Sequence, residues 1–216
     1  MRGIFVVGTD TGVGKTLVCA ALMAAGEAGL RYWKPVQTGA LDDDDTETVR
    51  RLARLGPERL IERGVRLRAP ASPHHAAALE GQELRLEPLL AIADGLAGPV
   101  VVEGAGGLLV PISATLLLPD LIRALALPVL VVGATRLGTI NHTLLTLAEL
   151  RRQGLQTLGL VLSGPPDPSV DTALAAHARD LPIHSMLPMD LGDFEALGDA
   201  GRGLVHAPQI AAQLRG

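Results

Sequence analysis

The sequence predicts an α/β fold in which a mostly parallel β-sheet is flanked by helices. Short runs rich in valine and leucine recur between segments with helical periodicity. These runs are continuously apolar rather than alternating, as expected of strands that are buried on both faces. The chain has 216 residues, 48% of them hydrophobic. It is long enough to bury a full core, and we expect residues 1–216 to form a single domain.

The apolar runs give the expected strands, and the periodic segments between them give the expected helices. Strands bounded by glycine or proline are expected at residues 4–7, 100–102, 129–132 and 158–162, and a further strand-like segment ends at Lys34. Helices are expected at residues 15–25, 46–55, 86–96, 116–125, 141–153, 170–179 and 209–214. Ligands of open parallel sheets bind at the carboxyl ends of the strands, so functional residues are expected in the loops there.

Composition excludes several classes of partner. The 19 basic and 23 acidic residues give a net charge of −4 without a basic block, so we expect no nucleic-acid partner. The apolar runs are shorter than the ~20 residues of a membrane-spanning helix, so no membrane association is expected. The single cysteine, Cys19, cannot form an internal disulfide, and the chain starts with a strand-like segment rather than a charged leader. These features predict a cytoplasmic protein.

A phosphate-binding loop is indicated by "VGTDTGVGKT", residues 7–16. It joins the first strand to the first helix, the context in which a Gly-Lys-Thr tripeptide binds nucleotide phosphates, and predicts a fold of the P-loop nucleoside triphosphate hydrolase type. The backbone N–H groups of Gly12, Val13, Gly14 and Lys15 can converge on phosphate oxygens. Lys15 would reach the terminal phosphates and Thr16 would ligate Mg²⁺.

The loop is a variant of the standard pattern. Thr9 stands where that pattern has glycine, and the glycine is Gly8. Chromosome-partitioning ATPases, which share this general loop, carry a second lysine where this chain has Asp10. The substitution disfavours that class of nucleotide-dependent switch.

Two acidic segments hold candidate magnesium ligands. Glu103 ends the expected strand "VVVE" and precedes "GAGG", so its carboxylate is expected at the ligand-binding edge. A hard oxygen there suits Mg²⁺ bound with phosphates, although a solvated glutamate at a turn would look the same. The run "DDDD", residues 42–45, precedes a helical pattern. Its last members could cap that helix, and one of them could reach a metal.

Several segments together resemble the dethiobiotin synthetase family. They are "GTDTGVGKT", "KPVQTG", "SPHHAA", "VEGAGGLLVP" and "LGTINHTLLT", which start at residues 8, 34, 72, 102 and 137 and occur in the family's order, whereas the last quarter of the chain matches poorly. The resemblance implies an ATP- and Mg²⁺-dependent ligase of biotin synthesis. In that family CO₂ forms a carbamate on one amine of 7,8-diaminopelargonate, the carbamate attacks the γ-phosphate, and the second amine closes a ureido ring with release of phosphate.

The resemblance also implies roles for individual residues. Lys34, Lys15 and Thr11 would act in catalysis, and Thr16, Asp45 and Glu103 would hold Mg²⁺. Asp45 is preferred to Asp42, Asp43 and Asp44 because its spacing to the following helix matches the family. The substrate-binding residues would be Thr38, Gly106, Leu137, Gly138, Thr139 and Asn141. The nucleotide-binding residues would be Gly12, Val13, Gly14, Lys15, Thr16, Leu17, Asp45, Glu103, Gly104, Ala105, Gly106, Ser163, Gly164, Pro188, Met189 and Asp190.

The segment "LGTINH" bears on the oligomeric state that the resemblance implies. It precedes an expected helix whose N-terminus can receive an anion. In the family this segment comes from the neighbouring subunit and binds the substrate carboxylate, which implies a homodimer with its active site at the subunit interface. Locally, Asn141 could also serve as the N-cap of that helix.

The chain departs from the family where the nucleotide base is read. Ser163 takes the place of an asparagine and cannot offer both an amide donor and an acceptor, so nucleoside triphosphates other than ATP could be accepted. Residues 187–190 are expected near the base or ribose, with Glu195 further out. Gly12 stands where some members have glutamate.

The sequence also has to be weighed against two other functions. An amide-forming synthase of the cobalamin type would need a glutaminase domain with a cysteine nucleophile, and Cys19 is more typical of core packing. A nucleotide-switched dimer would not need "KPVQTG" or "LGTINH". His74 and His75 are adjacent and diverge on any regular element, so a structural role is favoured over a metal site.

Overall fold

The computed structural model describes residues 1–41, 44–178, 181–190 and 192–214. Within these residues, seven strands form one parallel sheet in the order β4-β2-β6-β1-β7-β8-β9. The strands are β1 (Arg2–Gly8), β2 (Arg31–Trp33), β4 (Leu60–Ile61), β6 (Pro99–Gly107), β7 (Val129–Ala134), β8 (Thr157–Ser163) and β9 (Ile183–Met186). A second, two-stranded parallel sheet pairs β3 (Val36–Gln37) with β5 (Val65–Arg66). The predicted α/β fold is confirmed.

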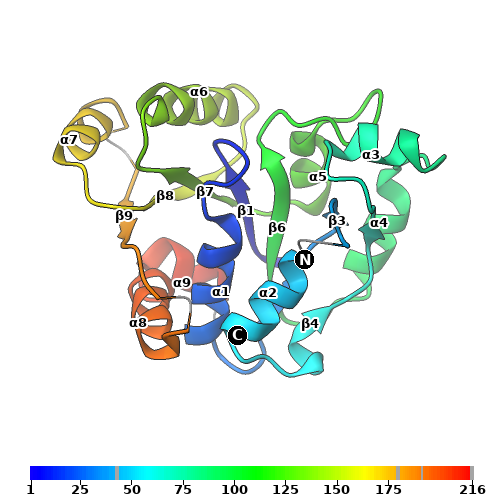
Figure 1. The fold of residues 1–216 in the computed structure, drawn as a ribbon, viewed down its shortest axis with the longest axis horizontal. Coiled ribbons are helices and arrows are strands. Elements are labelled where there is room, and N and C mark those ends of the chain that lie inside the picture. Colours follow the sequence, from blue (N-terminus) through cyan, green and yellow to red (C-terminus); the bar gives the residue numbers. More distant parts are fainter. Residues whose placement is uncertain (42–43, 179–180, 191, 215–216) are drawn as a thin grey trace.

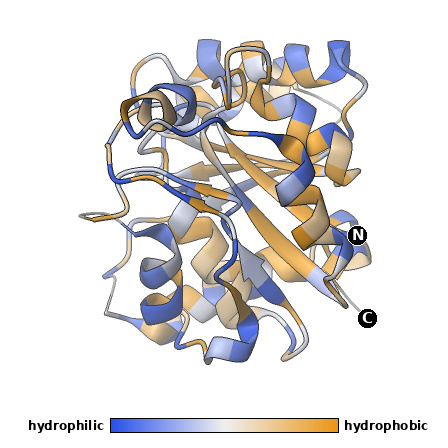
Figure 2. Ribbon diagram, turned by 90° about the vertical axis from the view of Figure 1, so that its right-hand side faces the viewer, coloured by the Kyte–Doolittle hydropathy of each residue, from blue (hydrophilic) through white to orange (hydrophobic). Residues whose placement is uncertain are grey.

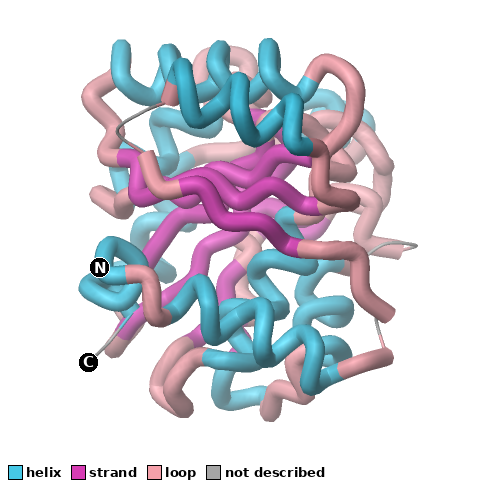
Figure 3. The backbone as a smooth tube through the Cα atoms, turned by 90° about the vertical axis from the view of Figure 1, so that its left-hand side faces the viewer, coloured by secondary structure: helices cyan, strands magenta, loops and turns pink. Residues whose placement is uncertain are grey.

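Helices cover both faces of the large sheet (Figures 1 and 3). One face packs against α1 (Lys15–Ala25), α2 (Asp45–Leu52), α8 (Phe194–Val205) and α9 (Pro208–Leu214). The other packs against α3 (Pro73–Leu79), α4 (Leu86–Asp94), α5 (Leu118–Leu125), α6 (Thr139–Arg152) and α7 (Pro168–His177). A short 3₁₀ helix, Pro57–Arg59, precedes β4.

Each central strand contributes side chains to both hydrophobic cores. In β1, Ile4 and Val6 belong to the core under α1, whereas Phe5 and Val7 belong to the core under α5. This division explains the continuous apolar runs, because successive strand residues point to opposite faces and both faces are covered. Figure 2 shows the apolar strands enclosed between helices whose outer surfaces are more polar. No helix in the described part of the chain combines the length and apolar character needed to cross a bilayer.

Most predicted elements are present, with shifted ends. The first helix has the predicted bounds, 15–25. The predicted helix 86–96 ends at Asp94 because Gly95 follows as its C-cap, and the helix predicted at 46–55 spans Asp45–Leu52. The helix predicted from residue 116 begins two residues later, and those predicted from residues 141 and 170 begin two residues earlier. The last helix begins one residue before its predicted start. The predicted end of α7, Arg179, lies outside the described residues.

Helices α3 and α8 and strands β3, β4, β5 and β9 were not predicted. The strands among them have four residues or fewer, too short for a clear pattern. Helix α8 contains Gly198, Gly201 and Gly203, and glycine weakens the helical signal because it is a poor helix former. Its formation therefore depends on packing rather than on intrinsic propensity.

Gly201 accounts for that packing, because it lets α8 approach α1 closely. A Cβ atom at this position would lie 1.9 Å from the Ala21 carbonyl oxygen and 2.9 Å from the Ala25 Cβ. A Cβ at Gly203, on the same helix, would have nothing within 4 Å. The two glycines therefore differ in the contacts that an added methyl group would make.

We predict opposite effects of alanine at these two positions. Gly201→Ala should lower the free energy of unfolding by about 1–3 kcal/mol because the methyl group would force α8 away from α1. Gly203→Ala, the matched control, should raise it by about 0.5–1 kcal/mol because alanine is the better helix former. Chemical denaturation measures both changes. Equal effects at the two positions would show that α8 does not depend on this close approach.

Candidate active site

The phosphate loop connects β1 to α1 and depends on two glycines. Gly12 has φ 69° and Gly14, the N-cap of α1, has φ 94°, which are left-handed values that favour glycine. A Cβ at Gly14 would also lie 2.6 Å from the Ser163 hydroxyl oxygen at the end of β8. The loop thus needs glycine at residue 14 both for its backbone conformation and for its contact with β8.

Lys34 lies at the centre of a cluster of buried charges. Its Nζ lies 2.6 Å from Asp45 Oδ2 and 2.9 Å from Glu103 Oε1, and donates to the Gly104 carbonyl oxygen at 3.1 Å. The side chains of Lys34 and Glu103 are 4% and 0% exposed. Buried charges are tolerated when they are paired and hydrogen-bonded, as these are. The cluster joins the end of β2, the start of α2 and the middle of β6.

The pKa shifts of Lys34 and Asp45 favour their charged forms, whereas the pKa shift of Lys15 favours its neutral form. Burial lowers the pKa of Lys34, but the carboxylates of Glu103 and Asp45 outweigh burial and raise it above its usual value. Burial likewise raises the pKa of Asp45, but the charge and hydrogen bond of Lys34 and the hydrogen bond of Thr16 hold it below its usual value. Burial, followed by the charge of Lys34, lowers the pKa of Lys15. The ammonium of Lys34 and the carboxylate of Asp45 are therefore both charged at neutral pH.

Thr16 brings a third oxygen to the two carboxylates. Its Oγ1 lies 2.7 Å from Asp45 Oδ1 and 3.0 Å from Glu103 Oε1. Two carboxylates and a hydroxyl are hard oxygen donors of the kind that hold Mg²⁺ together with phosphates and water. The residues therefore fit a magnesium ion. Because Lys34 contacts the same carboxylates, its ammonium and a divalent cation would compete for them.

The acidic run divides its roles between two neighbours. Asp44 is the N-cap of α2 and accepts hydrogen bonds from the backbone N–H groups of Thr46 and Glu47 at 2.9 and 3.3 Å. It also forms an ion pair with Arg66. Asp45, the first residue of the helix, turns its carboxylate into the cluster. The predicted helix cap is thus confirmed for Asp44, and Asp45 lies beside Lys34 and Thr16, while Asp42 and Asp43 lie outside the described residues.

The prediction that Glu103 ends its strand is wrong. Strand β6 continues to Gly107, and its pairing with β1 passes from Val6↔Glu103 to Gly8↔Gly107 with an irregularity in between. This extension runs beside the phosphate loop, and Gly106 there has φ 66°, a left-handed value that favours glycine. A Cβ at Gly107 would lie 3.4 Å from the Thr9 carbonyl oxygen, and one at Gly106 would lie 3.5 Å from the Thr11 hydroxyl oxygen.

Two side chains that support the cluster were not predicted. The Tyr32 hydroxyl donates to Glu103 Oε2 at 2.8 Å. The Gln37 side chain accepts from the Asp45 backbone N–H at 3.2 Å and donates to the Thr38 carbonyl oxygen at 2.8 Å. Strand periodicity could have indicated Tyr32, since residues two apart in a strand share a face and Tyr32 is two residues before Lys34. The motif "KPVQTG" contains Gln37 without revealing its partners.

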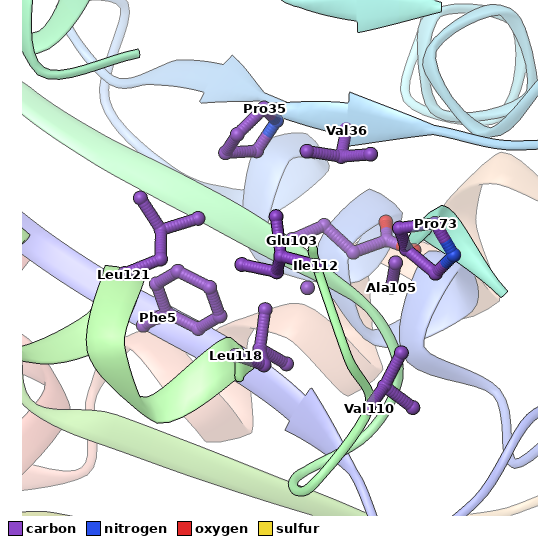
Figure 4. A pocket seen from close by; sticks show the side chains of 11 residues that line it. Phe5, Pro35, Val36, Pro73, Glu103, Ala105, Val110, Ile112, Leu118 and Leu121 are labelled. Atoms are coloured by element: carbon purple, nitrogen blue, oxygen red, sulfur yellow. The ribbon is translucent and has the colours of Figure 1, made fainter. Parts of the chain in front are cut away.

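A narrow apolar pocket lies beside Glu103 (Figure 4). Its lining includes Phe5 of β1, Ile112 and Leu118 near the start of α5, and Pro73, the first residue of α3. Pro73 belongs to the "SPHHAA" motif, so that motif contributes to the walls around Glu103. An apolar wall keeps the local dielectric low, which strengthens the interactions of the Glu103 charge.

The remaining predicted residues differ in how far they are exposed. In the phosphate loop and α1, Thr11 and Gly12 are exposed, Val13 is buried and Leu17 is half-buried. Ala105 and Thr38 are half-buried, as are Ser163 and Gly164 at the end of β8. After β9, Pro188 and Asp190 are exposed and Met189 is half-buried. Cys19 packs in the core under α1. His74 and His75 are exposed on α3, and the described residues contain no group of three or more His, Cys, Asp or Glu side chains that could hold a metal ion.

The start of α6 differs from the prediction. The helix begins at Thr139 with Gly138, φ 93°, as its N-cap, so the prediction of Asn141 as N-cap is wrong. The left-handed Gly138 starts the helix early and makes Asn141 its third residue. Leu137, Gly138 and Asn141 are exposed, whereas Thr139 is buried. Arg136, just before them, donates to Asp10 of the phosphate loop at 2.8 Å and links this segment to the site.

Comparisons with known proteins identify relatives of most of the chain. Residues 2–192 match a family model described as an AAA domain. The ATP-dependent dethiobiotin synthetase BioD of Brucella ovis is 44% identical over 176 residues, which cover 82% of this chain and 81% of that protein. BioD of Bradyrhizobium diazoefficiens is 43% identical, covering 82% and 83%. The biotin biosynthesis bifunctional protein BioCD of Bordetella avium is 47% identical over 91% of this chain, which spans only 42% of that longer relative.

Solved structures share the fold at low sequence identity. A ParA family ATPase from Chlorobium tepidum has a TM-score of 0.55 and 14% identity, with 99% of this chain and 97% of that chain covered. HypB from Helicobacter pylori in complex with nickel has a TM-score of 0.51 and 11% identity, covering 99% and 89%. These likenesses place the chain among P-loop ATPase folds and bear on the fold alone.

Competition between Lys34 and a divalent cation predicts a metal-dependent stability. Without divalent cations, Lys34→Met should lower the free energy of unfolding by about 3–5 kcal/mol, because it leaves buried carboxylates without their counter-charge. Mg²⁺ should then raise the Tm of the variant more than that of the unchanged protein. Thermal unfolding in EDTA and in Mg²⁺ measures both effects.

The matched control is Arg50→Met, which removes an exposed cation of α2 that pairs with Glu47. It should change little, because exposed ion pairs contribute little to stability. If Mg²⁺ raised the Tm of the unchanged protein and of Lys34→Met equally, the ammonium and the metal would not share ligands.

Proposed function

The chain belongs to the family of ATP-dependent dethiobiotin synthetases, and we propose that Lys34, Lys15 and the two carboxylates carry out ring closure on 7,8-diaminopelargonate. Membership rests on relatives of that name at 43–44% identity over 82% of the chain. The activity is that of an ATP-dependent ligase of biotin synthesis that forms a carbon–nitrogen bond. The observation that carries the assignment of residues is the convergence of Lys34 and Thr16 on the carboxylates of Asp45 and Glu103.

The phosphate loop would hold the triphosphate. Backbone N–H groups of residues 12–15 and the N-terminus of α1 favour phosphate oxygens. The Lys15 ammonium donates to the Asp10 carbonyl oxygen at 3.2 Å and so lies across the loop, where it would meet the terminal phosphates. Thr16, Asp45 and Glu103 would hold Mg²⁺, which supplies positive charge to the phosphates when bound.

Lys34 would change partners during the reaction. Its ammonium is held by Asp45 and Glu103, the two carboxylates that fit the metal. Once these carboxylates have a divalent partner, Lys34 is free to turn toward an anionic substrate. The exchange keeps the buried charges balanced, because one cation replaces another next to each carboxylate.

The proposed chemistry brings together two anions. One amine of the substrate takes up CO₂ and loses a proton to give a carbamate, and a carbamate oxygen attacks the γ-phosphorus as ADP leaves. The second amine then attacks the carbonyl carbon of the mixed anhydride, phosphate leaves and the ring closes. Lys15 and Lys34 would offset the repulsion between carbamate and triphosphate in a fixed geometry. Thr11, on the loop, and Thr38, beside β3, would bind the substrate.

A homodimer with its active site at the subunit interface is also part of the proposal. Leu137 is fully exposed and Leu145, further along α6, is 61% exposed. Large apolar side chains at the surface favour a protein partner. Asn141 is exposed between them and Gly138 leaves the helix N-terminus open to an anion. A second copy would thus receive the substrate carboxylate from residues 137–141, with Gly106 near the reacting end.

Nucleotide choice follows from the residues that would surround the base. Ser163 lies against Gly14 and offers a single hydroxyl, so we propose that nucleoside triphosphates other than ATP are also accepted. Pro188, Met189 and Asp190 would lie near the base or ribose. The use of ATP and the single buried cysteine support a cytoplasmic enzyme.

The direct test supplies the purified protein with diaminopelargonate, bicarbonate, Mg²⁺ and ATP. We expect ADP, phosphate and the ureido product in equal amounts, measured by mass spectrometry and a phosphate assay. In the same assay Lys34→Met should form product at least about a hundredfold more slowly, because it removes charge needed in the transition state. The nucleotide affinity of Lys34→Met should stay close to that of the unchanged protein. Hydrolysis that ignores the diamine, without ureido product, would instead favour a nucleotide switch.

Asn141→Ala tests the proposed interface site. Asn141 is not the N-cap of α6 and caps no other helix in the described part of the chain, so its loss should leave stability unchanged. We expect the KM of the diamine to rise about tenfold, as for the loss of a hydrogen bond to a charged group, with kcat nearly constant. The control is Gln209→Ala, which removes an exposed amide from α9. An unchanged KM for Asn141→Ala would argue against contact between this segment and the substrate.

A further inference from the structure

Tyr32 is a buried polar side chain that the reaction itself does not use. It lies in β2 with no exposed surface, beside β6, where it pairs with Val101. Glu103 lies two residues further along β6 and so on the same face of the sheet. A tyrosine can reach such a diagonal neighbour, and the Tyr32 hydroxyl donates to Glu103 Oε2 at 2.8 Å.

The contacts of Glu103 separate its two carboxylate oxygens. Oε1 faces Lys34 at 2.9 Å and Thr16 at 3.0 Å, toward the phosphate loop. Oε2 accepts from Tyr32, a different partner from those of Oε1. Burial raises the pKa of Tyr32 well above its usual value, and the nearby Glu103 charge raises it further. Because an ionised carboxylate can only accept, the Tyr32 hydroxyl is the donor in this contact.

We propose that Tyr32 is a positioning residue that holds the Glu103 carboxylate with Oε1 toward the phosphate loop and thereby sets the affinity of the site for a divalent cation. The inference rests on the proposed role of Glu103 as a magnesium ligand. A carboxylate turns readily about its last bond. With a donor fixed on Oε2, that rotation is restrained before the metal binds, so the carboxylate loses less conformational entropy on binding.

Removal of the hydroxyl has two opposite consequences for the metal. The carboxylate loses its orientation, which weakens binding, and partners of this kind commonly account for about ten- to hundredfold in metal affinity. Without the Tyr32 hydroxyl, the Glu103 carboxylate also keeps more of its negative charge. This second effect strengthens the binding of a divalent cation. The sign of the change therefore separates a positioning role from a purely electrostatic one.

Tyr32→Phe removes the hydroxyl and keeps the ring. We expect the dissociation constant for Mn²⁺, measured by electron paramagnetic resonance on the complete chain, to rise about tenfold or more. Catalysis should be restored when Mg²⁺ is raised, so that the Mg²⁺ concentration for half-maximal rate increases and kcat changes little. A tighter or unchanged Mn²⁺ affinity would overturn the proposal.

The control is the next residue on the same strand. Trp33 is also fully buried, and its Nε1 donates to the Arg63 carbonyl oxygen at 2.7 Å, but its side chain belongs to the core on the other face. Trp33→Phe should lower the Tm, as expected for loss of a buried hydrogen bond, and leave Mn²⁺ affinity within about twofold. An equal loss of Mn²⁺ affinity in both variants would indicate general destabilisation and reject a role specific to Tyr32.

Glu103→Gln separates this inference from the function on which it rests. If Glu103→Gln keeps the Mn²⁺ affinity of the unchanged protein, the assignment of Glu103 as a ligand fails and the role of Tyr32 fails with it. If Glu103→Gln loses Mn²⁺ while Tyr32→Phe retains it, the ligand assignment stands and the inference about Tyr32 alone is wrong. Weaker Mn²⁺ binding in both variants, with Trp33→Phe unaffected, supports both.

Discussion

The pairing of Lys34 with Glu103 is the interaction on which the site depends. Both side chains are almost completely removed from water, where an unpaired charge would be costly. The pair holds the end of β2 against the middle of β6, and Asp45 adds the start of α2 to the same cluster. Buried ion pairs contribute little to stability relative to well-packed apolar residues. A cluster of this kind is therefore better explained by what it does than by the stability it adds.

The parallel sheet explains how such distant residues meet. Thr16, Lys34, Asp45 and Glu103 come from four segments, and Thr16 and Glu103 are 87 positions apart in the sequence. In a parallel sheet every strand reaches the same edge with its carboxyl end, so loops from different parts of the chain converge there. Strand β6 then extends past Glu103 through "GAGG" and lies along the phosphate loop, and Gly106 takes a left-handed conformation on the way. The fold thus supplies the meeting point.

The sequence predicted those parts of the site that local chemistry determines. The phosphate loop and Glu103 were indicated by strand runs and turn glycines, whereas the role of Lys34 was implied by the family resemblance. Whether Asp44 or Asp45 reaches the cluster depends on which residue starts α2, which is a matter of one residue in helix register. Tyr32 and Gln37 were missed because their role exists only through partners in other segments. Helix α8 was missed because its glycines weaken the helical signal, and the packing of Gly201 against α1 cannot be read from propensity.

The fold alone would have left the function open, because likeness to a ParA family ATPase and to HypB extends over nearly the whole chain. What distinguishes this chain lies in side chains at the sheet edge. Asp10 accepts from the Thr11 backbone N–H at 2.7 Å and from Arg136 at 2.8 Å, so a carboxylate of the phosphate loop is tied to the segment that precedes α6. That contact couples the loop to residues 137–141, which we propose bind the substrate of a neighbouring subunit. A lysine at residue 10 would instead place two cations face to face, so the same fold with that one change could not keep this connection.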